Sequence, residues 1–291
     1  MSRANLERSE ERWCALVVGN SRQHWAMFSG SELQQTWDVS YTKGEAKTPQ
    51  QWAEWQALSP ALQCINEGGT SDEERQWPSL WILSVVPHQT QLWQGYPRGT
   101  LLQLTDIPLP GMYTSLGCDR ALALWAAGEI YGWPMLVIDG GTALTLTGAN
   151  ASGHLVGGAI LPGIALQLSS LTQATPLPDL QPADPTPPRW AKNTADAMRS
   201  GVIHTIWAGL SDFIQSWCQD FSSSHIVLTG GDHQQIFQGL KALHNPTASS
   251  DTAASQIPNA GYEPCQNQLV CDETLLFQGI QRLRAKRLES Q

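Results

Sequence analysis

The sequence predicts an α/β fold made of two similar halves that meet across a cleft. The order of a strand, a glycine turn and two further strands occurs twice, beginning at residue 13 and again at residue 135. Apolar residues at helical spacing fill residues 119–133, between these two sets of strands. With 41% hydrophobic residues, the 291-residue chain is long enough to bury a core in each half.

We expect the N-terminal half to span residues 13–118, after a polar tail at residues 1–12. Its strands are expected at residues 13–18, 22–28, 36–41 and 80–86. Gly19-Asn20-Ser21 separates the first two strands and predicts a hairpin turn. Residues 43–78 are rich in Gln, Glu and Trp, and we interpret them as a peripheral insertion with some helix.

The C-terminal half is expected over residues 119–291. Its strands are predicted at residues 135–138, 143–147, 154–161 and 225–229. Its helices are predicted at residues 119–133, 194–217, 234–243 and 274–287. The proline-rich residues 176–188 predict a loop, and the Ala-, Ser- and Thr-rich residues 245–260 predict a mobile surface insertion.

Charge and composition exclude several classes of function. A net charge of −9 argues against binding to nucleic acid or to an anionic membrane surface. No apolar stretch approaches the ~20 residues needed to cross a bilayer. Six scattered cysteines without a CxxC pair indicate reduced thiols rather than a zinc site or a disulfide framework. We therefore expect a cytoplasmic protein with neither nucleic-acid nor membrane partners.

Two glycine turns are candidate phosphate sites, because their backbone N–H and hydroxyl groups can point at phosphate oxygens. They are Gly19-Asn20-Ser21 and Gly140-Gly141-Thr142. A plain hairpin turn is the commoner explanation for either one alone. Neither turn is a Walker A loop, and no GxGxxG fingerprint is present. The Gly230-Gly231 pair after a predicted strand either passes close to an adenine ring or simply connects a strand to a helix.

Two carboxylates are candidates for chemistry. Asp119 begins a predicted helix, where it can accept a proton from a substrate hydroxyl while Arg120 holds a carboxylate or a phosphoryl group. A helix-start acid followed by a solvated cation is equally compatible with this spacing. Asp139 ends a predicted buried strand, where it can hold a metal ion or cap the following turn. An acid, an arginine and glycine turns in one chain suggest phosphoryl transfer.

As a set, these motifs resemble those of the type III pantothenate kinases, which belong to the actin, hexokinase and heat-shock-chaperone ATPase superfamily. The resemblance covers most of the chain. It rests on Gly19-Asn20-Ser21, Leu116-Gly117-Cys118-Asp119-Arg120, Asp139-Gly140-Gly141-Thr142-Ala143, residues 157–163 and Asn193-Thr194, in this order. The resemblance implies two duplicated ribonuclease-H-like halves, each with a mixed five-stranded sheet flanked by helices, around an interdomain cleft.

The resemblance also implies a reaction, in which the γ-phosphoryl group of ATP passes to the primary hydroxyl of pantothenate in the first step of coenzyme A synthesis. Asp119 would be the general base. The pantothenate site would comprise Gly117, Cys118, Asp119, Arg120, Tyr113 and Thr194. The ATP site would comprise Val18, Gly19, Asn20, Ser21, Arg22, Gly141, Thr142, Gly230 and Gly231. Magnesium would accompany ATP, and Asp139 would hold a monovalent cation, K⁺ or NH₄⁺.

Family members are expected to form homodimers, with Thr194 reaching the substrate across the dimer interface. From the sequence alone, an N-cap is the more common reading of the Lys192-Asn193-Thr194 segment.

Two positions depart from the family pattern. Val17 stands where the family usually has an aspartate that helps to place magnesium, and Pro110 stands where it usually has a pocket tyrosine. Tyr113 is the nearest replacement for that tyrosine. Two alternatives therefore stay open: a non-catalytic, metabolite-binding or regulatory relative, and a kinase for another small hydroxyl compound.

Overall fold

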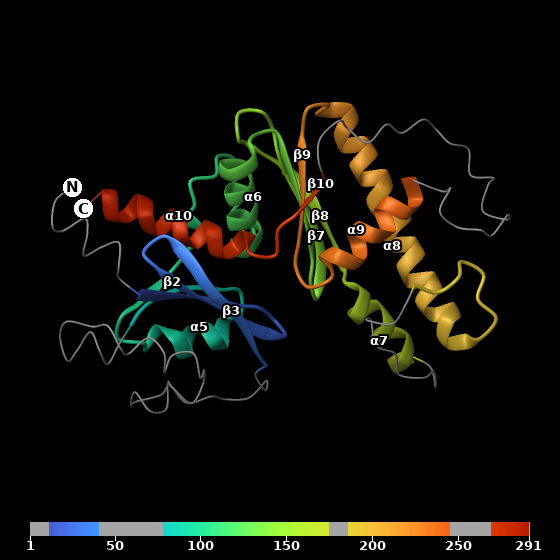
Figure 1. Ribbon diagram of the computed structural model, residues 1–291, viewed down its shortest axis with the longest axis horizontal. Coiled ribbons are helices and arrows are strands. Elements are labelled where there is room, and N and C mark those ends of the chain that lie inside the picture. Colours follow the sequence, from blue (N-terminus) through green and yellow to red (C-terminus); the bar gives the residue numbers. More distant parts are fainter. Residues whose placement is uncertain (1–11, 41–77, 175–185, 245–268, 291) are drawn as a thin grey trace. The chain divides into compact units, whose positions relative to one another are not determined.

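The computed structural model describes residues 12–40, 78–174, 186–244 and 269–290 (Figure 1). The chain divides into two compact units. Unit 1 comprises Met1–Pro108, Met112–Ala126 and Leu276–Gln291, and unit 2 comprises Leu109–Gly111 and Ala127–Leu275. The C-terminal segment therefore returns to the unit that contains the N-terminal strands.

Unit 1 contains a mixed five-stranded sheet. Its strands are β1 (Arg12–Val18), β2 (Arg22–Ser29), β3 (Glu32–Ser40), β4 (Ser79–Ser84) and β5 (Gly99–Leu101), in the order β3-β2-β1-β4-β5. β1 is antiparallel to β2 and parallel to β4. Because β1 is covered on both faces, six of its seven residues are buried, which explains its almost continuous apolar sequence.

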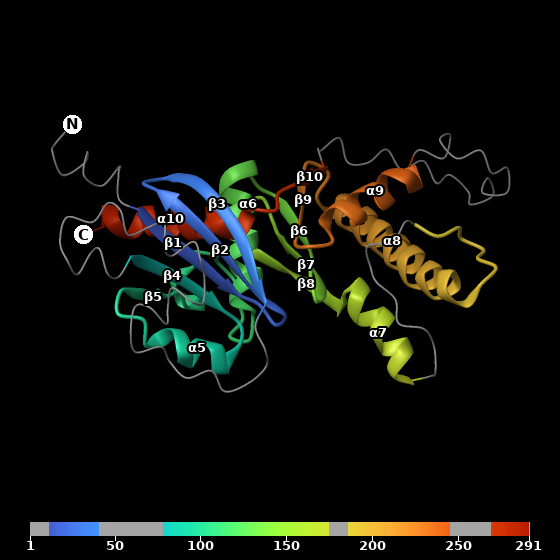
Figure 2. The same cartoon turned by 60° about the horizontal axis from the view of Figure 1, so that its bottom comes forward.

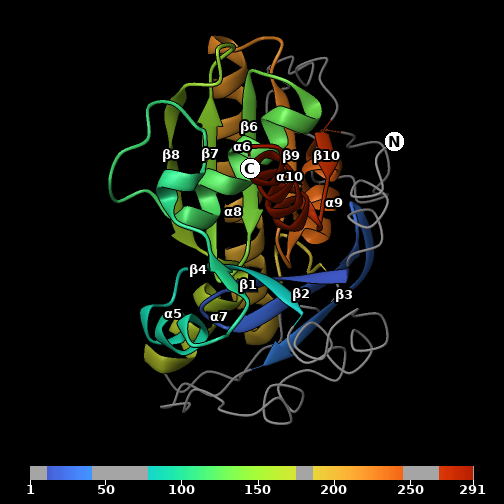
Figure 3. The ribbon, with the colours of Figure 1, turned by 90° about the vertical axis from the view of Figure 1, so that its left-hand side faces the viewer.

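Unit 2 repeats this arrangement (Figure 3). Its strands are β6 (Met135–Gly140), β7 (Ala143–Ala149), β8 (Leu155–Pro162), β9 (His225–Thr229) and β10 (Leu269–Cys271), in the order β10-β9-β6-β7-β8. β6 is antiparallel to β7 and parallel to β9, as β1 is to β2 and β4. This shared topology confirms the predicted pair of similar, ribonuclease-H-like halves.

Helices flank both sheets. They are α5 (Pro87–Gln94), α6 (Cys118–Tyr131), α7 (Ile164–Ala174), α8 (Thr194–Asp220), α9 (His233–His244) and α10 (Leu275–Glu289), with a 3₁₀ turn at η2 (Leu104–Asp106). The predicted helices correspond to α6, α8, α9 and α10. The sequence did not predict α5, α7, β5 or β10. The two missed strands have three residues each, too few to show a period-two pattern, and they exist because a parallel neighbour pairs with them.

Tryptophans build much of the core of unit 1. Trp13 stacks on Phe28 with ring centroids 4.3 Å apart, and Trp25 meets Trp93 edge-on at 5.2 Å. α10 packs against α6, where a Cβ on Gly279 would lie 3.0 Å from the side chains of Ala126 and Leu122. Trp13, Trp25 and Trp93 are fully buried, so core packing accounts for them.

In unit 2, the apolar face of α8 packs with α7 and α9 against the sheet. Its buried residues include Ile203, Ile206 and Leu210, which share a core with Leu136 and Ile138 of β6. Two glycines leave room for tryptophan rings, because a Cβ on Gly148 would overlap the Trp217 indole and a Cβ on Gly239 would overlap the Trp207 indole. The sheet and the three helices thus hold β6, and the Asp139-Gly140 sequence at its end, in a fixed place.

Several expectations have a definite outcome. No helix among the described residues is long and apolar enough to span a membrane. Cys14, Cys118 and Cys271 are free thiols, but Cys218 is disulfide-bonded, so the expectation of reduced cysteines is wrong for Cys218. The predicted insertions at residues 43–78 and 245–260, and most of the loop at residues 176–188, lie outside the described residues.

Candidate active site

Asp119 lies in the first turn of α6, at the point where the loop from unit 1 enters the helix. Its Oδ1 accepts a hydrogen bond from the backbone N–H of Arg120 at 2.8 Å. The helix proper begins with the hydrogen bond from Ala121 N to Gly117 O, 3.0 Å long. The carboxylate is therefore attached to a rigid element and held by an N–H group that the helix leaves unpaired.

Burial raises the pKa of the Asp119 carboxyl above its ordinary value of 3.8. The hydrogen bond from the Arg120 N–H and the positive charge of Arg120 oppose this rise but do not cancel it. A raised pKa makes a carboxylate a stronger base, which suits a group that accepts a proton from a hydroxyl.

Gly117 leaves the space that the Asp119 carboxylate occupies. A Cβ at this position would lie 2.6 Å from Asp119 Oδ1, closer than real Cβ atoms approach another heavy atom. Glycine is therefore required at this position of the Gly-Cys-Asp-Arg motif, because any side chain there would displace the Asp119 carboxylate.

Arg120 follows Asp119 in the chain, and Tyr113 contacts Arg120. Arg120 Nη1 donates to the Tyr113 hydroxyl at 3.4 Å, and the Tyr113 side chain is exposed. A guanidinium and a phenol together present donors to an anionic or polyhydroxy ligand. Cys118 adds no nucleophile, because burial and then the charges of Asp119 and Asp106 raise the pKa of its thiol to about 12.

The turn Gly19-Asn20-Ser21 joins β1 to β2, as predicted. A hydrogen bond of 3.0 Å from Gly19 N to Arg22 O closes it, and Asn20, Ser21 and Arg22 are exposed. Val18, just before the turn, is fully buried in β1. The residues of the turn thus lie at the surface, while its base is anchored in the sheet.

In unit 2, Asp139 lies near the end of β6, between two glycines. A Cβ on Gly230 would overlap Asp139 Oδ1, and one on Gly141 would lie 3.6 Å from it. Gly230 has a φ of +83°, which other residues rarely adopt. Asp139 is therefore packed between the Gly141 turn and the Gly230 turn. Carboxylate oxygens such as those of Asp139 are ligands that hard cations prefer.

Backbone contacts brace the second glycine turn. Gly163 N donates to Thr142 O at 2.9 Å, and a Cβ on Gly163 would collide with Gly141 O. Asp232 N donates to Gly140 O at 2.8 Å, which ties the Gly230-Gly231 turn to β6. Thr142 and Gly231 are exposed. The structure thus brings the two predicted nucleotide turns of unit 2 together.

His233 is a supporting residue that the sequence did not reveal. Its buried ring places Nδ1 2.6 Å from Gly230 O, so Nδ1 carries the proton and donates. This bond holds the left-handed Gly230 turn at the N-terminus of α9. Because the contact depends on the strand-to-helix turn, no sequence spacing could have indicated it.

Thr194 is the first residue of α8 and is exposed. Asn193 is the N-cap, and its side chain accepts from Asp196 N at 2.9 Å. The capping role expected for this segment is confirmed, and it leaves the Thr194 hydroxyl at the surface. Among the described residues, no group of three His, Cys, Asp or Glu side chains could hold a metal ion.

Comparison with known proteins assigns this chain to a family. The family model of type III pantothenate kinase matches residues 15–216, a range that includes Asp119, Asp139 and Thr194. The chain belongs to the type III pantothenate kinase family. A type III pantothenate kinase of Nostoc sp. is 38% identical, with 98% of this chain and 99% of that protein covered. One from Synechococcus sp. is 43% identical, with 82% of this chain and 87% of that protein covered.

A solved structure supports the fold of this family member. A Baf family protein from Campylobacter jejuni superposes with a TM-score of 0.55 over 95% of this chain and 99% of that one. Its sequence identity is 17%, so the likeness concerns the fold alone.

Proposed function

We propose that this protein transfers the γ-phosphoryl group of ATP to the primary hydroxyl of pantothenate, the first step of coenzyme A biosynthesis. Membership of the type III pantothenate kinase family supports the reaction. The observation that favours catalysis by this chain is Asp119, a carboxylate with a raised pKa held at the start of α6. It is the general base of the proposed reaction.

In this proposal, Asp119 orients the pantothenate hydroxyl and accepts its proton as the new O–P bond forms. Phosphoryl transfer passes through a loose transition state, so the proton leaves late and orientation matters more than strong basicity. Gly117 and Cys118 line the site, Arg120 and Tyr113 bind the polar groups of pantothenate, and Arg120 also offsets the charge that develops. The 3.4 Å contact between Arg120 and Tyr113 supports their joint role and the replacement of the tyrosine lost at Pro110.

The nucleotide site of the proposal comprises the turn from Val18 to Arg22, the Gly141-Thr142 turn and the Gly230-Gly231 turn. The exposed polar residues of the first two turns suit phosphate oxygens, and Gly230-Gly231 suits the adenine ring. Magnesium, bound through ATP phosphates and water, would neutralise phosphate charge. Asp139 would hold K⁺ or NH₄⁺, together with nearby backbone carbonyl groups.

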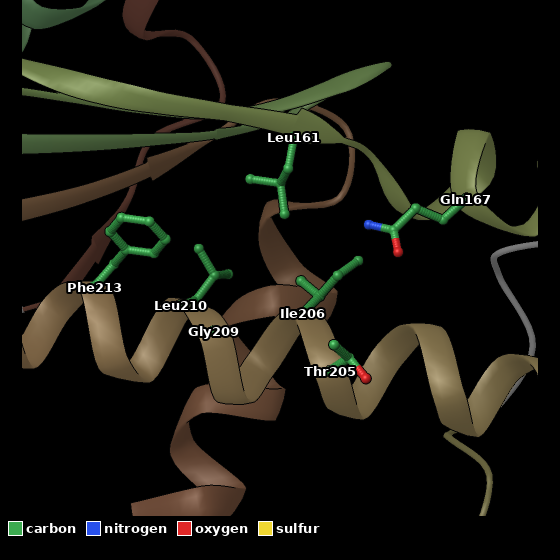
Figure 4. Close-up of a pocket in the computed structure, with 7 residues that line it drawn as sticks. All are labelled: Leu161, Gln167, Thr205, Ile206, Gly209, Leu210 and Phe213. Atoms are coloured by element: carbon green, nitrogen blue, oxygen red, sulfur yellow. The ribbon is translucent and has the colours of Figure 1, made fainter.

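We also propose a homodimer with the active site near the interface, where Thr194 reaches the partner's substrate. An apolar surface of unit 2 supports it. On the edge strand β8, Ile160 is 64% exposed and Val156 52% exposed. On the other face of β8, Leu161 lines a cavity of about 210 Å³ together with Ile206 and Phe213 of α8 (Figure 4). Apolar groups of this size on a strand edge are commonly covered by another chain.

A coupled ADP-release assay tests the reaction, with pantothenate, ATP and Mg²⁺ in the presence of K⁺. We expect ADP release that depends on pantothenate. Folded protein without pantothenate-dependent turnover, in K⁺ and in NH₄⁺, contradicts the proposal. Other small hydroxyl compounds are tested in the same assay. If one of them supports ADP release and pantothenate does not, the protein is a kinase for that compound.

Val17 favours a second candidate function, that of a metabolite-binding or regulatory relative without catalysis. This side chain is 6% exposed and provides no ligand for a metal near the first phosphate turn. Binding of pantothenate or ATP in calorimetric titration, with no phosphorylated product in the assay above, would support this second function.

A further inference from the structure

The loop that leads into α6 is anchored by three apolar residues. It comprises residues 107–117, and α6 is the green helix labelled in Figure 2. Ile107, Leu109 and Leu116 are buried. Connecting loops are usually more mobile than the elements they join, because they bury little apolar surface. This loop buries three side chains, so its exposed residues are attached to a defined backbone.

Tyr113 lies between two tight turns of this loop. Before it, Pro110 and Gly111 form a turn in which Gly111 has a φ of +81°. Proline followed by glycine at a positive φ is the pattern of a type II turn. After it, Leu116 N donates to Tyr113 O at 3.0 Å and closes the second turn. The backbone of Tyr113 is therefore held on both sides.

Strand β8 holds the first of these turns. Leu155, the first residue of β8, donates its N–H to Pro110 O at 2.9 Å. A Cβ on Gly111 would lie 3.5 Å from both the backbone N and the backbone O of Leu155, so the turn lies against this residue. Proline has a fixed φ and no N–H, so its carbonyl is the one hydrogen-bonding group it offers. The bond to Leu155 thus sets the position from which the chain continues to Tyr113.

Burial does not fix the side chain of Tyr113. The residue is 46% exposed, and its hydroxyl accepts from Arg120 Nη1 at 3.4 Å. Because a phenol oxygen can accept and donate at once, the Tyr113 hydroxyl can also donate to an acceptor on a ligand. The direction of an exposed ring depends on its backbone, so a change in the preceding turn would move the hydroxyl.

We propose that Gly111 is a positioning residue for pantothenate, because its left-handed turn, tied to Leu155 through Pro110, directs the Tyr113 hydroxyl towards this substrate. The inference rests on the proposed function, which places pantothenate beside Tyr113 and Arg120. It also gives a role to Pro110, which stands where the family usually has its pocket tyrosine. Pro110 begins the turn that presents Tyr113.

Gly111→Ala tests this role in the pantothenate assay. An alanine at a φ of +81° is strained, so the turn must relax and Tyr113 must shift. We expect the KM for pantothenate to rise about tenfold, the effect of one lost hydrogen bond to a charged group. The kcat and the KM for ATP should stay unchanged, because Asp119 is held separately at the start of α6 and the heavy atoms nearest to the new Cβ all belong to Leu155.

Gly132→Ala is the matched control. Gly132 also has a positive φ, +97°, and a Cβ there would lie 3.6 Å from its nearest neighbour, His225 Nε2. Both alanine variants should therefore unfold at a lower temperature, but Gly132→Ala should leave the KM for pantothenate unchanged. Gly111→Asn should raise this KM less than Gly111→Ala, because asparagine adopts left-handed conformations more readily. An unchanged KM in Gly111→Ala, or an equal rise in Gly132→Ala, overturns the inference and leaves the proposed function intact.

A double-mutant cycle shows whether Gly111 acts through Tyr113. Tyr113→Phe keeps the ring and removes the hydroxyl, and we expect it to raise the KM for pantothenate about tenfold as well. Adding Gly111→Ala to Tyr113→Phe should then have little further effect, because the hydroxyl that the turn positions is already absent. A combined rise of about a hundredfold, the product of two independent effects, or no effect of Tyr113→Phe alone, overturns the inference.

Absence of turnover in the unmodified protein contradicts the proposed function, and pantothenate binding in calorimetric titration then tests the positioning role. About tenfold weaker binding by Gly111→Ala, with unchanged binding by Gly132→Ala, supports this role. Equal affinity of Gly111→Ala and the unmodified protein overturns it, as does an absence of pantothenate binding.

Discussion

The backbone N–H of Arg120 holds Oδ1 of Asp119 at 2.8 Å, and this bond couples the proposed base to the start of α6. The same residue supplies a positive charge that partly offsets the cost of burying the carboxylate. Arg120 thus acts on Asp119 twice, through its backbone and through its side chain.

Asp119→Asn should strongly lower turnover without unfolding the protein. The amide has nearly the same volume and can still accept from Arg120 N, but it cannot take a proton from the substrate. General-base catalysis contributes typically about 10²–10⁴-fold, so we expect a loss of kcat in that range. Steady-state kinetics measure it, with circular dichroism as the check on folding. Glu32→Gln, at an exposed carboxylate on β3, is the control and should keep full activity.

The activity of the unmodified protein should fall on the acid side at a pH above the ordinary titration range of aspartate. The base must be ionised to act, and the pKa of Asp119 is raised, so protonation begins earlier as the pH falls. A profile of kcat/KM against pH measures this limb. An acid limb at or below the ordinary value of 3.8 would show that Asp119 is not the group that limits the rate.

Asp119→Asn should also raise the free energy of unfolding at neutral pH. Because the folded state raises the pKa of Asp119, it disfavours the ionised carboxylate relative to the unfolded chain. This destabilisation is present above the folded pKa and disappears as the pH falls below the unfolded value. Denaturant unfolding of both proteins should therefore differ at pH 7 and converge in acid. A variant that is less stable at pH 7 contradicts the prediction.

Gly117→Ala should lower kcat by about 10²-fold, the typical effect of displacing a catalytic group by about 1 Å. Its Cβ would lie 2.6 Å from Asp119 Oδ1, so the carboxylate must move. Gly201→Ala is the matched control, because a Cβ there meets nothing within 4 Å and lies on the exposed side of α8. It should keep activity and stabilise the fold by about 0.5–1 kcal/mol, the helix preference for Ala over Gly. If Gly117→Ala were as active as Gly201→Ala, the close approach of residue 117 to the Asp119 carboxylate would not matter for catalysis.

Ile160→Asp should convert a dimer into a folded monomer. The side chain is 64% exposed on the edge strand β8, so a carboxylate is tolerated in the single chain but not in an apolar interface. Analytical ultracentrifugation measures the mass of each species. Leu33→Asp, at a 37% exposed position on β3 in unit 1, should leave the dimer intact. A monomeric unmodified protein would contradict the proposed dimer directly.

Much of the fold was accessible from sequence because its signals are local. β9 was predicted with its observed ends, and β1, β2 and α6 within about one or two residues, the usual uncertainty of element ends. α5 and α7 were missed. α5 has Pro87 at its N-terminus and only eight residues, and only Gly163 separates the start of α7 from the end of β8.

The sequence by itself determined the duplicated α/β plan, the two glycine turns and the position of Asp119 at a helix start. Apolar periodicity, glycine and helix-start chemistry act over a few neighbouring residues, so they can be read along the chain. Only the tertiary structure decided the raised pKa of Asp119, the contact of Gly163 with the Gly141 turn and the pairing of β1 with β4. These depend on burial and on strand register, which bring together residues that are distant in sequence.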